Sequence, residues 1–185
     1  MKRAATVLAA LLAACSPQTA GPAPVPPPGA ATAAPEGWTA YTDPYGFTVS
    51  YPASLVLLPE PEPLPALRPP LLHRVRFLDR QLAAGDTAAL EPPQFSVEVF
   101  AAPSGPLRPW LEDNGRLSNG SGVEILEVPG AHEALRIRDP QMLAPNEFFW
   151  VAAGPNAFLI VALGPEGEAM RKTFRLTRRE EGTIR

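Results

Sequence analysis

Apolar and polar residues alternate along much of the chain after residue 38, with the two-residue period of half-buried β-strands. The clearest run is Phe47-Thr48-Val49-Ser50-Tyr51, whose first, third and fifth side chains share one face. Equally regular runs predict strands over 72–79 and 95–101. Further segments with strand character are 38–42, 55–58, 123–128, 133–139, 147–153, 157–163 and 174–176.

The segment 157–163 is apolar on both faces, and a strand of this kind needs one covering layer above it and another below. In the preceding strand, Phe148 and Trp150 face one side, whereas Phe149 and Val151 face the other. We expect these aromatic side chains in the core. An incomplete layer on one side would leave a ligand groove beside Phe149 and Val151.

Two helices are expected among the strands, besides a possible single turn at 81–83. Ser104 is a suitable N-cap for the first helix, and Gly115 suits its end. Its apolar face would comprise Leu107, Trp110 and Leu111. The second helix spans about 166–173, with acidic residues early and basic residues late, as the helix dipole favours. Strands and helices together predict an α+β fold, a mostly antiparallel sheet flanked by helices.

The first residues have the character of a targeting signal. A short basic start is followed by an apolar run over 4–14, which is too short for the ~30 Å hydrocarbon core of a membrane. The run ends Leu12-Ala13-Ala14-Cys15, which resembles the lipobox of bacterial lipoprotein signals. That resemblance implies removal of residues 1–14 and a diacylglycerol on Cys15, with Ser16 rather than Asp favouring the outer membrane. The alternative is an ordinary secretory signal with an incidental cysteine.

Proline content separates a tether from a folded domain. Residues 15–37 contain seven prolines and only one large apolar residue, Val25, so this segment is expected to be an extended, solvated spacer. The folded domain is expected over 38–178, followed by a short tail over 179–185. A second proline-rich stretch, 59–70, is expected to be a loop within the domain.

Composition narrows the function classes. The formal net charge is −3 and no basic stripe is present, which argues against nucleic acid as a partner. One cysteine and two histidines, His73 and His132, offer little for a zinc site, and their spacing does not indicate a catalytic triad. We expect both histidines at surface or strand-edge positions, no metal and no cofactor.

Other polar motifs have plain structural interpretations. The acids of Glu112-Asp113-Asn114 are expected on the solvated face of a helix, because a calcium site would need six or more oxygen ligands in a loop. Glu60 and Glu62 are expected in a solvated loop. Gly120-Ser121-Gly122 precedes a strand rather than a helix, so it is expected to be a turn and not a phosphate-binding loop.

The segment Tyr41-Thr42-Asp43-Pro44-Tyr45-Gly46-Phe47-Thr48-Val49-Ser50-Tyr51-Pro52 resembles the opening motif of the PsbP/Mog1-like superfamily. A mid-chain helix, a Glu133-Ala134-Leu135-Arg136 strand and a closing hairpin, helix and Thr173-Phe174-Arg175-Leu176 segment follow in the family's order. The resemblance covers 38–176 and implies an α/β/α sandwich that serves as a noncatalytic binding scaffold. The loop over 59–70 departs from the family pattern, and Leu55 stands where an aromatic residue is common.

Three functions remain open from the sequence. The first is a lipid-anchored, noncatalytic module that binds another envelope protein, with Cys15 holding it in the membrane. The second is a carrier or sensor of a small apolar ligand bound beside Phe149 and Val151. The third is an envelope hydrolase, which would need His73 or His132 close to a serine and a carboxylate.

Overall fold

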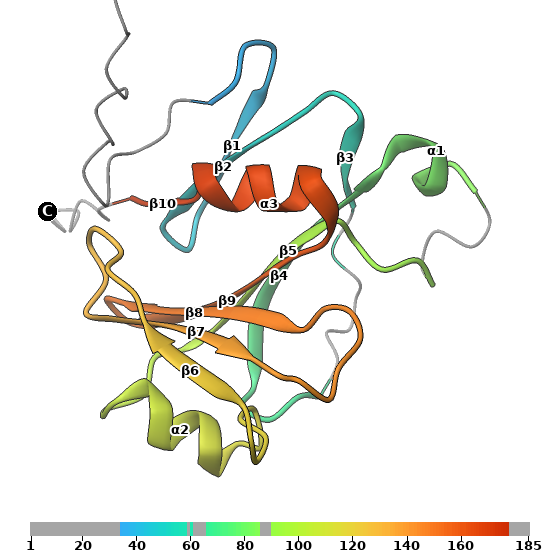
Figure 1. Cartoon of the computed structure of the whole chain (residues 1–185). Coiled ribbons are helices and arrows are strands. Elements are labelled where there is room, and N and C mark those ends of the chain that lie inside the picture. Colours follow the sequence, from blue (N-terminus) through green and yellow to red (C-terminus); the bar gives the residue numbers. More distant parts are fainter. Residues whose placement is uncertain (1–33, 59, 61–65, 86–89, 178–185) are drawn as a thin grey trace, which may run out of the picture.

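The fold is taken from a computed structural model that describes residues 34–58, 60, 66–85 and 90–177 (Figure 1). The predicted signal peptide, Cys15, most of the tether and the C-terminal tail lie outside the described residues. Two antiparallel sheets account for most of the regular structure. The predicted α+β class with mostly antiparallel strands is confirmed.

The larger sheet has seven strands in the order β3-β4-β5-β9-β8-β7-β6. Their bounds are β3 (Leu55–Leu58), β4 (Leu71–Asp79), β5 (Phe95–Ala101), β6 (Gly122–Ile125), β7 (Glu133–Arg138), β8 (Glu147–Ala153) and β9 (Asn156–Ala162). The smaller sheet contains β1 (Thr39–Asp43), β2 (Phe47–Tyr51) and β10 (Arg175–Leu176), with β2 in the middle. β10 lies near the C-terminal end of the domain and pairs with β2, which lies near its N-terminal end. The two ends of the domain therefore meet in the small sheet.

The core lies on both faces of the large sheet, as the doubly apolar strand predicted. Phe158 and Ile160 of β9 belong to the cluster that includes Phe47 of β2. Leu159 of β9 points the other way, into the cluster that includes Leu107. Figure 1 shows the small sheet and α3 (Gly164–Thr173) on one side of the large sheet and α2 (Leu107–Asp113) on the other. The molecule therefore has three layers.

The mid-chain helix begins later than its sequence indicated. Ser104 does not cap α2: the residue before its first turn is Pro106, which supplies no side-chain cap. The backbone N–H of Leu107 instead donates to the carboxylate of Glu133, at 2.6 Å. A carboxylate complements the positive end of a helix better than a hydroxyl does. Gly115 follows the helix with φ of 65°, as predicted.

The strand predicted over 123–128 is shorter, since β6 ends at Ile125. Leu126 still donates its N–H to the carbonyl of Ala134, at 2.8 Å. Beyond it the chain leaves the sheet and turns at Pro129 and Gly130, where proline has no N–H to donate and glycine adopts φ of 86°. This departure places 126–129 above the sheet face rather than in the sheet.

Helix α3 is fixed to both sheets by backbone contacts. The hydroxyl of Thr173 accepts a hydrogen bond from the N–H of Ser50, at 2.9 Å, on β2. At its other end, Leu163 donates its N–H to the carbonyl of Gln94, at 2.7 Å, beside β5. Gly167 is buried against the same carbonyl, and a Cβ there would overlap it.

Gly167→Ala is therefore expected to destabilise the domain by about 1–3 kcal/mol, the usual cost of overpacking. In an exposed helix the same change would stabilise the protein by up to about 1 kcal/mol. A loss of stability would therefore identify the close contact between Gly167 and the carbonyl of Gln94. Urea unfolding of the full chain measures it. Gly105→Ala is the control, because a Cβ at Gly105 meets open space. An unchanged or raised stability for Gly167→Ala would contradict the tight packing of α3.

Candidate functional site

A groove of about 420 Å³ opens beside Phe149 and Val151, on the face of the large sheet that α3 covers. The floor belongs to β8 and β9. The walls come from the C-terminal part of α3, from β10 and from the segment 126–129 that has left the sheet. The apolar side chains that line it are Leu126, Val128, Pro129, Phe149, Val151, Ile160, Phe174 and Leu176.

Four charged residues also line the groove: Glu127, Arg171, Lys172 and Arg175. The guanidinium of Arg171 lies over the Phe149 ring, 4.2 Å from its centroid, and its Nε donates to Glu168 at 2.9 Å. Arg175 donates from Nη1 to the carbonyls of Lys172 and Phe174. The groove thus combines an apolar floor with a rim in which cations outnumber carboxylates.

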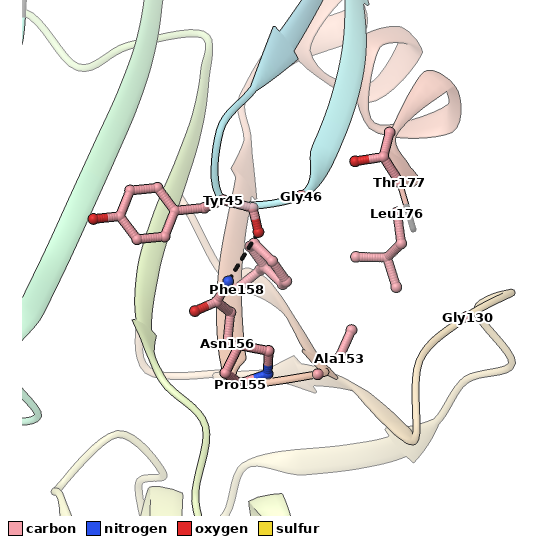
Figure 2. Close-up of a pocket in the computed structure, with 10 residues that line it drawn as sticks. Tyr45, Gly46, Gly130, Ala153, Pro155, Asn156, Phe158, Leu176 and Thr177 are labelled. Carbon is pink, nitrogen blue, oxygen red and sulfur yellow. Dashed lines mark hydrogen bonds between the residues drawn. The ribbon is translucent and has the colours of Figure 1, made fainter. Parts of the chain in front are cut away.

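A second hollow of about 450 Å³ adjoins the groove, and Leu176 lines both (Figure 2). Its walls come from the β1–β2 turn at Tyr45 and Gly46 and from the β8–β9 turn. The side-chain amide of Asn156 donates to the carbonyl of Tyr45, at 2.9 Å. This bond ties the two turns together and fixes the floor of the hollow.

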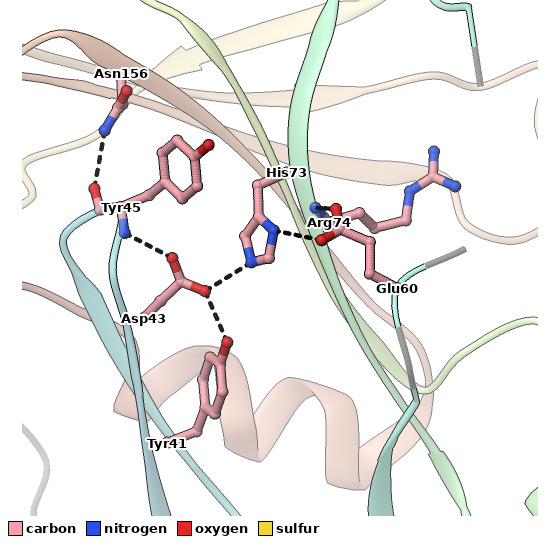
Figure 3. Close-up of polar contacts among 7 residues, drawn as sticks. All are labelled: Tyr41, Asp43, Tyr45, Glu60, His73, Arg74 and Asn156. Atoms are coloured by element: carbon pink, nitrogen blue, oxygen red, sulfur yellow. Dashed lines mark hydrogen bonds and ion pairs between the residues drawn. The ribbon is translucent and has the colours of Figure 1, made fainter. Parts of the chain in front are cut away.

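His73 lies beside this hollow in a chain of polar contacts that the sequence did not predict (Figure 3). Its Nε2 is 3.0 Å from Oδ2 of Asp43, and its Nδ1 is 2.9 Å from Oε2 of Glu60. The ring stacks on Tyr45, with centroids 5.1 Å apart. The predicted plain surface or edge role of His73 is therefore wrong. Glu60 is exposed in a loop, as predicted, but it also contacts His73.

Asp43 is the centre of this network, and its carboxylate is fully buried. Besides His73, it accepts hydrogen bonds from the hydroxyl of Tyr41 and from the backbone N–H of Tyr45, each at 2.8 Å. Burial raises the pKa of the Tyr41 hydroxyl, and the hydrogen bond to Asp43 and the nearby negative charges raise it further. Tyr41 is thereby held as a proton donor to the buried carboxylate.

The network does not have the arrangement of a serine triad. Both ring nitrogens of His73 face carboxylates, and within the described residues no serine hydroxyl contacts the ring. A general base needs one nitrogen free to take a proton from the nucleophile. His132 is exposed in the turn before β7. The geometry assigns His73 to binding two carboxylates together.

The other sequence candidates remain separate from the groove and from one another. Glu112 is exposed and pairs with Arg108, at 3.2 Å. Gly122 opens β6 and no helix follows it, so the glycine-rich segment is not a phosphate loop. Glu62 lies outside the described residues. Among the residues that the structure describes, no three of His, Cys, Asp and Glu are grouped to hold a metal ion.

Comparisons with known proteins give no assignment: no protein-family model matches the chain, and no curated protein sequence is significantly similar to it. Within the described ranges, no helix combines the length and apolar character that crossing a membrane requires.

Tyr41→Phe is expected to lower the free energy of unfolding by about 1 kcal/mol near neutral pH, the usual net value of a hydrogen bond. Because folding raises the Tyr41 pKa above its ordinary value of 10.0, the stability from its protonated form is intact below that value. It is lost as the pH rises through the folded-state pKa. The gap between wild type and Tyr41→Phe should therefore narrow in strong alkali.

Urea unfolding at a series of pH values measures this gap. Tyr51→Phe is the matched control, because it removes a half-buried hydroxyl that has no hydrogen-bond partner among the described residues. Parallel pH profiles for wild type and Tyr41→Phe would show that the hydroxyl does not support the Asp43 network.

Proposed function

We propose that this protein is a lipid-anchored, noncatalytic binding protein of the cell envelope that carries or senses a small apolar ligand. The observation that supports the ligand is the groove beside Phe149 and Val151. Its volume of about 420 Å³ falls within the range of ~300–1000 Å³ usual for small-molecule sites. An apolar lining with a few polar groups at the rim is also typical of such sites.

The construction of the groove favours ligand binding over accidental poor packing. Its floor side chains, Phe149, Val151 and Ile160, are almost fully buried in two central strands, so the floor is rigid. Phe174 closes one side and is buried with them. A rigid floor with preformed walls lets a ligand bind without the entropic cost of ordering the site.

A protein partner is the second candidate, and the exposed apolar side chains at one end of the sheet favour it. Ile125 on the edge strand β6 is 81% exposed, and Leu143 in the loop before β8 is fully exposed. Exposed apolar residues on an edge strand are typical of surfaces that add a strand or bind a partner. These side chains are scattered, whereas the groove is a continuous concave site, so we place the small ligand first.

The envelope location rests on the lipobox resemblance and on the tether. In this proposal, Cys15 carries the acyl chains, residues 15–37 span the distance to the bilayer, and the domain faces away from the cytoplasm, on the outer membrane where the cell has one. The PsbP/Mog1-like assignment is part of the same proposal. It is supported by the Tyr41–Pro52 motif, whose strands and turn correspond to β1, Asp43–Gly46 and β2.

Cys15→Ala is expected to leave an unprocessed precursor without acyl groups, because the thioether needs the thiol. Metabolic labelling with an alkyne fatty acid, followed by gel mobility, measures both properties. Ser16→Ala is the control and should be labelled normally. Normal labelling of Cys15→Ala would remove the lipid anchor from the proposal.

The ligand proposal predicts saturable binding of a neutral apolar dye, N-phenyl-1-naphthylamine, to the full chain carrying Cys15→Ala. Leu126→Trp and Leu176→Trp fill the groove from two of its lining segments and should each weaken binding about tenfold, an effect of about 1.4 kcal/mol. Ile125→Trp is the matched control, since this neighbour of Leu126 points into solvent.

Circular dichroism and thermal unfolding check that each variant folds. Equal dye affinity in all three variants would place the dye elsewhere on the chain. Absence of saturable binding to the parent chain would count against the ligand proposal and shift weight to the protein partner, which crosslinking in the native membrane would then identify.

A further inference from the structure

The rim of the groove has an uneven charge distribution. Three cations, Arg171, Lys172 and Arg175, line it from the end of α3 and from β10. Two carboxylates lie near them: Glu127, which also lines the groove, and Glu168, which pairs with Arg171 on α3. The rim therefore carries one net positive charge directly above an apolar floor.

Arg171 is held in position to bind an anion. Its guanidinium stacks on the Phe149 ring and donates Nε to Glu168. Within the described part of the chain, its two terminal nitrogens donate to no protein acceptor. Because stacking and the Nε bond already fix the side chain, little rotamer entropy is lost when those nitrogens bind a ligand.

Lys172 provides a second positive charge next to that of Arg171. It is exposed and forms no ion pair with any described residue. Arg175 contributes less to a ligand, since its Nη1 already donates to two backbone carbonyls. The binding surface for an anion is thus formed mainly by Arg171 and Lys172, at one end of the apolar floor.

We propose that the ligand is a fatty acid: a single hydrocarbon chain in the groove against Leu126, Val128 and Leu176, which are partly exposed, with its carboxylate bound by Arg171 and Lys172. This inference rests on the proposed function and adds the ligand class. A carboxylate matches the planar fork of an arginine. A head group with two negative charges would meet stronger repulsion from Glu127 and Glu168 than a carboxylate does.

The test compares head groups on one tail. Laurate, dodecanol, dodecyl phosphate and dodecyltrimethylammonium compete with N-phenyl-1-naphthylamine for the full chain carrying Cys15→Ala, each below its critical micelle concentration. Laurate should bind about tenfold more tightly than dodecanol, as expected for charge-assisted hydrogen bonds. In the Arg171→Gln, Lys172→Gln double variant, the ratio of laurate affinity to dodecanol affinity should fall close to one, because both cations that bind the carboxylate are then neutral.

A matched control removes similar charges from the opposite face. Arg116 lies 5.6 Å from the centroid of the Phe100 ring, and Arg108 is exposed on α2. The Arg108→Gln, Arg116→Gln double variant should keep the full preference for laurate. Loss of the preference in this control would show that it reflects overall charge.

The outcomes separate this inference from the proposed function. Equal binding of laurate and dodecanol would overturn the head-group assignment and leave an apolar ligand in the groove. Tighter binding of dodecyl phosphate or of the trimethylammonium compound would also overturn it and name another head group. If no member of the series displaces the dye, the groove is not a site for single-chain amphiphiles.

Discussion

Burial of β9 on both faces is the constraint on which the other layers depend. A strand with Phe158 and Ile160 on one face and Leu159 on the other is stable only if apolar side chains cover both sides. One cover is α2, with Leu107 and with Trp110, whose ring packs edge-on against Trp150 of β8. The other is built from the two ends of the domain, since β2 comes early in the sequence and α3 and β10 come last. Closing that second layer therefore brings the termini of the fold together.

The groove follows from the way this second layer is assembled. Helix α3 packs on β2, β5 and β9, and Gly167 allows it to approach the backbone near β5 closely. Strand β8 is covered on this face by the side chain of Arg171 and by the segment 126–129, which leaves the sheet where β6 ends. Long side chains and a loop cover a sheet less completely than a helix does. The groove is thus left above a buried floor, between partly exposed apolar walls that include Leu126, Val128 and Leu176, and a concave apolar surface of this kind is typical of small-molecule sites.

Local patterns of the sequence predicted most of the strands and their inward faces, because these depend on alternation within a single element. They also indicated where a groove would lie if one covering layer were incomplete, but not that one exists. Phe149 and Val151 could be assigned to one face from their spacing alone. Contacts between distant segments could not be predicted in this way. Glu133 replaces Ser104 at the start of α2 from 26 residues away along the chain. His73 meets Asp43 and Glu60 at separations of 30 and 13 residues, and no spacing rule connects a turn, a proline-rich loop and a central strand.

The His73 network explains how the floor of the second hollow is kept rigid. The two ring nitrogens of His73 contact two different carboxylates, Nε2 that of Asp43 and Nδ1 that of Glu60. Glu60 also accepts the backbone N–H of Arg74, at 3.0 Å, and thereby joins the loop to β4. Asp43 holds Tyr45 by its backbone N–H, and Asn156 holds its carbonyl. Together with the stacking of Tyr45 on His73, these contacts fix the β1–β2 turn, and with it the wall of the hollow that adjoins the groove at Leu176. The polar network therefore supports the turn that adjoins the groove, whereas the charged residues at the end of α3 form the rim.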